Sequence, residues 1–157
     1  MILQLISGGQ TGVQRAALDA ALAHEFPCGG WCPKGRKAED GAIPDCYPLQ
    51  EMDSADYSKR AVRNVRDSDG TLIITREVPT GRTEFSLKTA RKHRRPVLVI
   101  ELGAMPSQAA AVDRILAWAD ERFIRGLNVT GPRESRCPGV YDDAHALLSA
   151  LLTRLKG

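Results

Sequence analysis

The chain has 157 residues, of which 43% are hydrophobic and 26% charged, a composition typical of a single globular domain. No apolar run approaches the roughly 20 residues that a membrane-spanning helix requires, and no secretory leader is visible, so we expect no membrane contact and a cytoplasmic location. The net charge of +3 suits an anionic small ligand and is too small for a nucleic-acid-binding surface.

The four cysteines are predicted to be reduced thiols, because the chain carries no export signal. They are Cys28, Cys32, Cys46 and Cys137. A zinc site built from the first three is the alternative, but structural zinc sites usually have two closely spaced cysteine pairs. We therefore predict no metal site.

The first strand is predicted over residues 2–6 and the first helix over residues 12–24. Alanines along one side of this helix would let it pack closely against a sheet. Arg15 and Asp19 are four residues apart, which predicts a weak ion pair on the exposed side of the helix.

Residues 26–53 are rich in proline and glycine, and only residues 28–32 have the pattern of a short strand. The apolar side chains within this segment favour an ordered lid over a disordered loop. Lys34 and Arg36 are candidates to hold an anion from above, with solvated loop charges as the alternative.

The remainder of the chain alternates between helix and strand patterns. Ser54 is the predicted N-cap of a weak helix that ends in the turn 67–70, and Asn64, Asp67 and Asp69 are either ring or ribose contacts or, as we favour, helix-end and turn residues. The other predicted strands are 71–75, 97–102 and 127–129, and the other predicted helices are 84–94, one capped by Ser107, and one carrying leucines from 147 to 155. The basic run 91–95 ends a helix, where cations complement the helix dipole, an interpretation we favour over an RNA-binding patch.

This alternation predicts a Rossmann-like three-layer α/β/α domain over residues 1–157, with a mostly parallel sheet of about five strands. In such sheets ligands bind at the carboxyl ends of the strands. Glycine-containing turns follow three of the predicted strands, so we expect them to meet at one edge. The candidate binding residues in these turns are Ser7, Gly8, Gly9, Gln10, Thr11 and Gly12, then Gly81, Arg82 and Thr83, then Gly131, Arg133 and Ser135.

The turn at residues 7–12 is predicted to hold a phosphate, because bare backbone can approach a ligand and the first N–H groups of a helix attract anions. We expect Gly9→Val to abolish ligand binding with little loss of stability. The turn matches neither the dinucleotide fingerprint nor the P-loop, so no hydride transfer or nucleotide hydrolysis is predicted from it.

Several motifs together resemble the circularly permuted YpsA-like family of molybdenum-cofactor carriers. They are SGGQTG at 7–12 with RAALD at 15–19, GGWCPKGR at 29–36, AEDG at 38–41, DSDGTL at 67–72, and LNV at 127–129 with GPRES at 131–135. The resemblance covers nearly the whole chain. It implies a Rossmann-like fold of the SLOG superfamily and, as ligand, a molybdenum cofactor or a nucleotide. A homo-oligomer and a molybdoenzyme acceptor are the partners that this resemblance leaves open.

Two positions depart from the family pattern. Arg82 stands where the family turn resembles Gly-Gly-Thr, which adds a side chain to that anion site, and Gln14 stands where the family tends to have aspartate. The related phosphoribohydrolases carry a P-G-G-x-G-T-x-x-E turn, and here Ser86 occupies the glutamate position. We therefore predict a binding protein without catalytic residues. The alternatives are a nucleotide-processing hydrolase using Glu39, Asp40 or Asp69, and a ligand sensor within a larger assembly.

Overall fold

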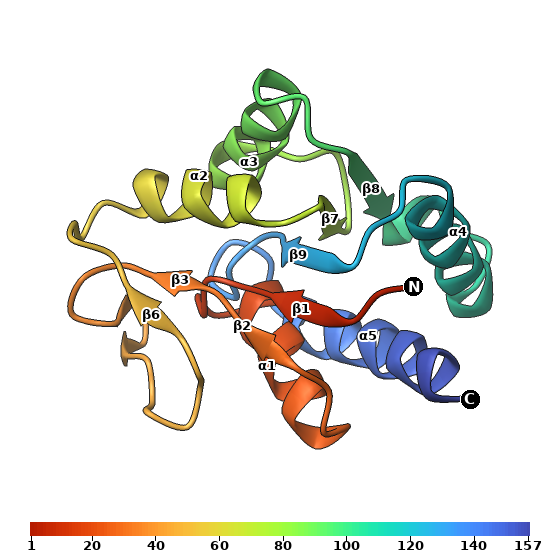
Figure 1. Ribbon diagram of the computed structural model, residues 1–157, viewed down its shortest axis with the longest axis horizontal. Coiled ribbons are helices and arrows are strands. Elements are labelled where there is room, and N and C mark those ends of the chain that lie inside the picture. The colour runs from red at the N-terminus through yellow and green to blue at the C-terminus, as the bar shows by residue number, and fades with distance from the viewer.

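Five parallel strands form the central sheet of the computed structural model, which describes residues 1–157. Their order across the sheet is β2-β1-β9-β7-β8 (Figure 1). The strands are β1 (Gln4–Ile6), β2 (Cys28–Gly29), β7 (Gly70–Thr75), β8 (Val97–Glu101) and β9 (Gly126–Thr130). The predicted parallel sheet of about five strands is confirmed.

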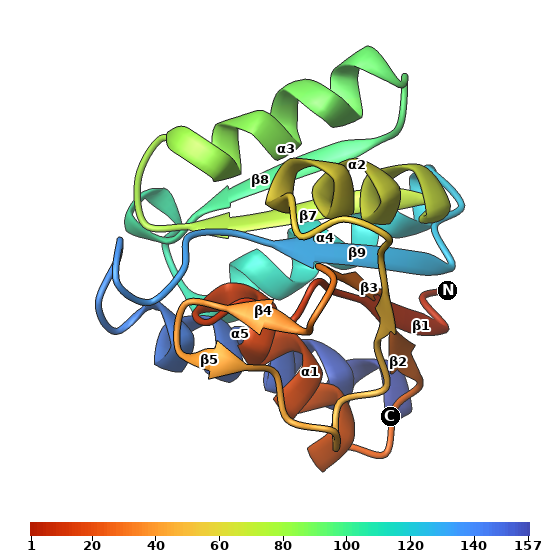
Figure 2. The ribbon, with the colours of Figure 1, turned by 90° about the vertical axis from the view of Figure 1, so that its left-hand side faces the viewer.

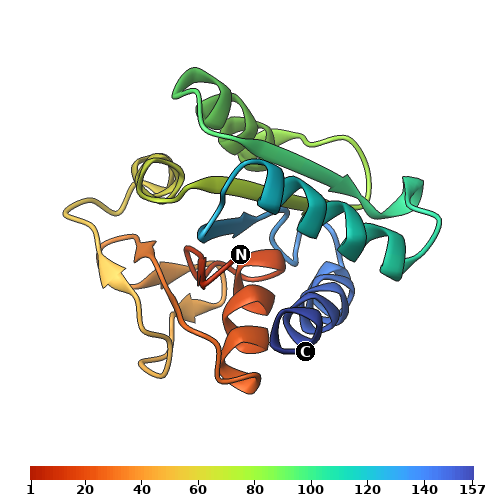
Figure 3. The same cartoon turned by 45° about the vertical axis from the view of Figure 1, so that its right-hand side comes forward.

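Helices cover both faces of this sheet, as a three-layer α/β/α fold requires. One face carries α1 (Val13–Ala23), α4 (Gln108–Glu121) and α5 (Val140–Lys156), and the other carries α2 (Tyr57–Asp67) and α3 (Gly81–Lys92) (Figures 1 and 3). A short 3-10 turn, η1 (Leu102–Ala104), follows β8. No helix is both long enough and apolar enough to cross a membrane.

The two faces of the sheet differ in polarity. Leu72 and Ile74 of β7 belong to the main apolar core, to which α1, α4 and α5 also contribute. The opposite side of β7 buries Thr71 and Thr75, and β9 buries Asn128 and Thr130 in the same way. Alternate residues of a strand point to opposite faces, so the layer under α2 and α3 combines these polar side chains with Ile73, whereas the other face is apolar.

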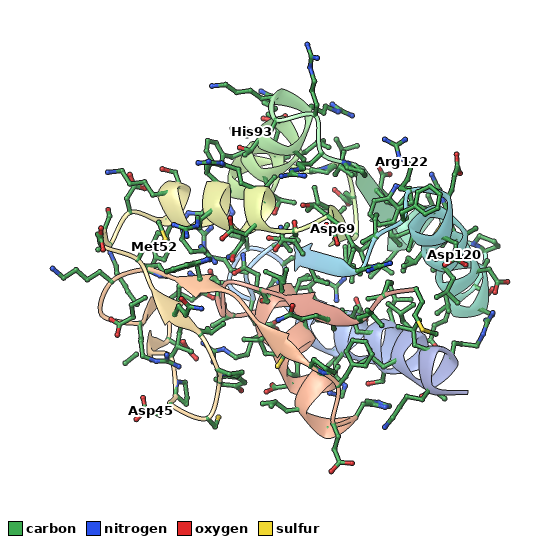
Figure 4. The ribbon with its side chains drawn as sticks, in the orientation of Figure 1. Asp45, Met52, Asp69, His93, Asp120 and Arg122 are labelled. Atoms are coloured by element: carbon green, nitrogen blue, oxygen red, sulfur yellow. The ribbon has the colours of Figure 1, made fainter.

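The predicted strand over residues 28–32 is divided in two in the structure, and residues 33–53 contain further short strands that the sequence did not predict. Gly30, with a φ of 139°, separates β2 from β3 (Trp31–Cys32), which leaves the main sheet and pairs with β6 (Gln50–Glu51). Between them lies a small antiparallel hairpin, β4 (Lys37–Ala38) and β5 (Gly41–Ala42), visible at the front of Figure 2. Figure 4 places Asp45 at the outer tip of the loop that follows this hairpin.

Two predicted helix starts are wrong. The N-cap of α2 is Asp56 and not Ser54, because the Asp56 carboxylate accepts the N–H of Ser58 at 2.8 Å. Helix α3 begins at Gly81 rather than at residue 84, so the predicted turn residues form its first turn.

The predicted pair between Arg15 and Asp19 is also wrong. Arg15 donates two hydrogen bonds to Asp40, at 3.0 and 3.2 Å, and Asp19 accepts the hydroxyls of Tyr47 and Tyr141, each at 2.5 Å. These partners are distant in sequence, so helical spacing alone could not reveal them. Both α1 side chains hold residues 40–47 against the body of the protein.

Candidate anion-binding cavity

A cavity of about 900 Å³ opens at the carboxyl ends of β7 and β9. Its walls come from the first turns of α2 and α3 and from residues 130–138, which lie on the left of Figure 2. Five arginines line it, namely Arg60, Arg76, Arg82, Arg133 and Arg136, against two carboxylates, Asp56 and Glu77. Such an excess of positive charge favours an anionic occupant.

Arg60 is the most unusual of these residues. Its side chain projects from α2 and is only 4% exposed, yet it forms no ion pair. One guanidinium nitrogen, Nη1, donates to Oε1 of Gln14, while the buried Nε has no partner. Burial, together with the charge of Arg82, lowers the pKa of Arg60 to about 10. A buried unpaired charge is costly, so this position favours an anion from outside the chain.

The N-terminus of α3 points two unpaired backbone donors at the same cavity. The N–H groups of Gly81 and Arg82 have no acceptor in the protein, because the first residues of a helix lack a preceding turn to bond to. The buried hydroxyl side chains of Thr83 and Ser86 lie on the cavity side of this helix. Backbone donors, hydroxyls and the helix dipole together form an anion-binding arrangement.

The arginines of the cavity divide into paired and unpaired groups. Arg76 contacts Asp143 at 2.9 Å and also donates to the Pro138 carbonyl, and Arg133 lies 3.4 Å from Glu39. Arg82 forms no ion pair, and its guanidinium stacks 4.2 Å from the centre of the Tyr57 ring. Arg60, Arg82 and Arg136 therefore leave their charges uncompensated by the protein.

The predicted turn at residues 7–12 uses most of its donors internally. The N–H of Gln10 donates to Gln14 Oε1 at 3.2 Å, and that of Thr11 donates to the Gln10 side chain at 2.9 Å. Gln10 also lines the cavity, and its buried Nε2 is unpaired, which makes it a donor available to a ligand.

Gly9 faces away from the cavity and toward packed side chains. A side chain at this position would therefore disturb the packing, contrary to the expectation that Gly9→Val blocks a ligand with little loss of stability. A Cβ built on Gly9 would lie 2.7 Å from Leu49 and 3.0 Å from Ile43, and its φ is 79°. Gly12 and Gly131 are similarly confined, with backbone carbonyls 2.3 and 2.2 Å from their Cβ positions. These glycines permit close packing between loops.

The structure brings six of the predicted binding residues to the cavity wall. They are Gln10, Gly81, Arg82, Thr83, Gly131 and Arg133. The large cavity is not lined by Ser7, Gly8, Gly9, Thr11, Gly12, Lys34, Arg36 or Ser135. Thr11 and Ser135 instead meet Arg133 at the carboxylate of Glu39, beside the cavity.

Lys34 and Arg36 do not close over the cavity. Lys34 is exposed, and Arg36 donates to the carbonyls of Ile43, Pro44, Tyr47 and Leu49. Arg36 thereby organises its own loop, because its guanidinium supplies the donors for four carbonyls of that loop.

The three polar residues at the end of α2 have structural contacts. Asn64 bonds the backbone of Trp31 through both its amide atoms, and Asp67 accepts the Trp31 indole N–H at 3.0 Å. Asp69, which is labelled in Figure 4, accepts the N–H groups of Arg125 and Gly126, before and at the start of β9. These contacts match the favoured interpretation as helix-end and turn residues.

Residues 5–152 match the Circularly permutated YpsA SLOG family. The chain belongs to this family. It is also similar to a crystal structure from Syntrophus aciditrophicus of a protein named "Putative molybdenum carrier protein", with 45% identity, a TM-score of 0.94, and coverage of 96% of this chain and 95% of that one. A search of curated proteins gave no match. The family predicted from the sequence motifs is confirmed.

The glycine-containing turns of this family predict part of the cavity wall, but several other wall residues lie outside those turns. Arg60, Tyr57 and Ser86 come from helix faces, and Arg76 and Arg136 from residues adjoining predicted turns. One usable signal was present. Thr71, Thr75, Asn128 and Thr130 recur at even spacing on adjacent strands, which indicates a polar sheet face.

Proposed function

We propose that this protein binds and carries a small phosphorylated ligand, either a molybdenum cofactor or a nucleotide. The observation that carries the proposal is the buried guanidinium of Arg60 at the wall of an arginine-lined cavity, which has no carboxylate partner and leaves its Nε without a hydrogen bond. The name of the similar Syntrophus protein supports molybdenum as the cargo.

The proposed phosphate position is the N-terminus of α3. Gly81 and Arg82 would donate their free N–H groups, while Thr83 and Ser86 would contribute hydroxyls. Arg136, from the loop before α5, lies close to the N-terminus of α3: its Nη2 is 3.8 Å from the position that a Cβ on Gly81 would occupy. Charge-assisted hydrogen bonds contribute about 1.5–3 kcal/mol each, so four or five suffice for micromolar binding after the cost of association.

Binding fits the cavity better than hydrolysis of the ligand. Of the two carboxylates at the wall, Asp56 caps α2, and hydrogen bonds from Ser58 lower its pKa, which disfavours a role as proton donor. The other, Glu77, is exposed. Glu39, Asp40 and Asp69 are the alternative acid or base residues. The first two pair with Arg133 and Arg15, and Asp69 accepts backbone N–H groups at the start of β9.

Calorimetric titration tests the proposal with inorganic phosphate, molybdate and nucleoside monophosphates, alongside mass spectrometry and metal analysis of the purified protein. Arg82→Leu keeps the backbone N–H but removes a guanidinium at the cavity wall that no carboxylate compensates, so it should weaken binding by roughly 10- to 100-fold, the equivalent of one charge-assisted hydrogen bond. Lys88→Leu is the matched control, because Lys88 lies on the same helix, pairs with Glu84 at 3.5 Å, and is absent from the cavity wall. Equal affinities of the two variants for every anion would refute the proposed site.

A further inference from the structure

The carboxylate of Glu39 occupies a small anion receptor beside the cavity. Its Oε2 accepts the hydroxyl of Thr11 and the N–H of Ser135, the latter at 3.2 Å. Its Oε1 accepts the Ser135 hydroxyl at 2.5 Å and lies 3.4 Å from Nε of Arg133. Two hydroxyls, one backbone N–H and one guanidinium therefore surround a single negative group.

This receptor stabilises negative charge. Burial raises the pKa of Glu39, but the hydrogen bonds from Ser135 and Thr11 and the charge of Arg133 outweigh it, so that the pKa lies below its usual value. The donors come from the β1–α1 turn and from residues 131–139, and these two segments are also joined by the N–H of Glu134, which donates to the Thr11 hydroxyl at 3.1 Å. Hydroxyls, backbone N–H groups and arginine also form the usual surroundings of bound phosphate.

The receptor adjoins the large cavity through Arg133, which belongs to both. The Glu39 side chain is 25% exposed, so it has solvent on one side. The neighbouring backbone is held independently, since the Glu39 N–H donates to Gln10 at 2.9 Å and Asp40 pairs with Arg15 at 3.0 Å. These contacts hold the backbone around Glu39 without using its carboxylate.

We propose that Thr11, Arg133 and Ser135 form a second anion subsite, which Glu39 fills in the empty protein and a second anionic group of the ligand takes over. This inference rests on the proposed function, because it assigns the ligand of the same cavity to the class of organic phosphates that carry a further anionic group. When the anionic group of the ligand replaces the Glu39 carboxylate, the charge of Arg133 is still balanced by a negative group. Glu39 thus excludes ligands that have one anionic group from the second subsite.

Equilibrium dialysis with radiolabelled inorganic phosphate, taken to saturation, tests the inference. The wild-type protein should bind about one phosphate per chain, and Glu39→Ala about two, because the substitution empties the subsite. Asp40→Ala is the matched control and should stay at the wild-type value, since Asp40 is the adjacent carboxylate and contacts Arg15 instead. Glu39→Ser replaces Glu39→Ala if the latter does not fold.

The second phosphate is assigned by combining Glu39→Ala with Thr11→Val. This pair should return the count to the wild-type value, because Thr11 contributes to the subsite and is absent from the large cavity wall. Equal counts of one or more for wild type and Glu39→Ala overturn the inference and leave the proposed function standing, whereas a count of zero for both overturns the two together. A count of zero for wild type and one for Glu39→Ala removes the phosphate position at α3 and supports the subsite.

Discussion

Arg60 provides the sharpest test of the cavity, because replacing it should separate stability from binding. Arg60→Met keeps an unbranched side chain in the same space and removes the charge. The substitution loses the hydrogen bond to Gln14, whose Oε1 still accepts the N–H of Gln10. It also removes the buried Nε that has no partner.

The free energy gained by removing the buried charge and the free energy lost with the hydrogen bond to Gln14 are similar in size. Burial is the main cause that lowers the pKa of Arg60 from 12.5 to about 10. At about 1.4 kcal/mol per pKa unit, the folded protein disfavours the charged form by about 3 kcal/mol. The lost hydrogen bond offsets about 1.5–3 kcal/mol of this. We therefore expect Arg60→Met to be as stable as wild type or more stable by up to about 2 kcal/mol, a rise in Tm of at most about 8 °C.

Thermal unfolding with and without ligand measures both effects. An anion present at about 100 times its Kd should stabilise the wild-type protein by about 2.7 kcal/mol and raise its Tm by about 5–10 °C, and this rise should be absent in Arg60→Met. Arg63→Met is the control on the same helix, because Arg63 is exposed and pairs with Asp67. A loss of more than about 2 kcal/mol in ligand-free Arg60→Met would refute the reasoning, because Arg60 would then stabilise the empty protein.

Three further predictions concern the framework around the cavity. Gly9→Val should lower the Tm by at least about 5 °C in differential scanning calorimetry, because the new side chain meets Leu49 and the φ is positive; an unchanged Tm would contradict this. Burial and the hydrogen bond to Asp19 raise the pKa of Tyr141 to about 12, so stability should fall as pH rises from about 10 to 12, and urea midpoints that stay constant there would count against that contact. Leu148→Ala should cost about 2–5 kcal/mol in urea unfolding, because Leu148 is fully buried, and a cost below about 1 kcal/mol would mean that the core collapses around the gap.

The sheet and its helices were predictable because the patterns that encode them are local. The apolar run at 71–75 and the heptad-like spacing of leucines in α5 depend only on the period of each element. The glycine turn at 81–83 was recognised, although its residues proved to be the first turn of α3. Gly81, Arg82 and Arg133 were correctly placed near one another for the same reason, since parallel strands end at one edge.

The partners of individual charges were not predictable in this way. Arg15 and Asp19 have ideal spacing for a helical pair, yet each contacts a residue of another segment. Arg36 carries the charge expected of a ligand contact, but bonds to carbonyl groups of its own loop. The partner of a charged side chain depends on which groups lie near it in the folded protein, and a long side chain such as arginine can reach several possible partners.

The sequence by itself determined the order of strands and helices, the family, and the edge of the sheet where turns collect, because hydrophobic period and turn chemistry act over a few residues. Only the tertiary structure decided which arginines remain without a carboxylate. Arg60 is buried without a carboxylate partner because α2 packs over the face of the sheet that carries Thr71, Thr75, Asn128 and Thr130. Arg133 has a carboxylate partner because the hairpin at residues 37–42 places Glu39 next to it. Charge compensation depends on distance through space, which no local pattern encodes.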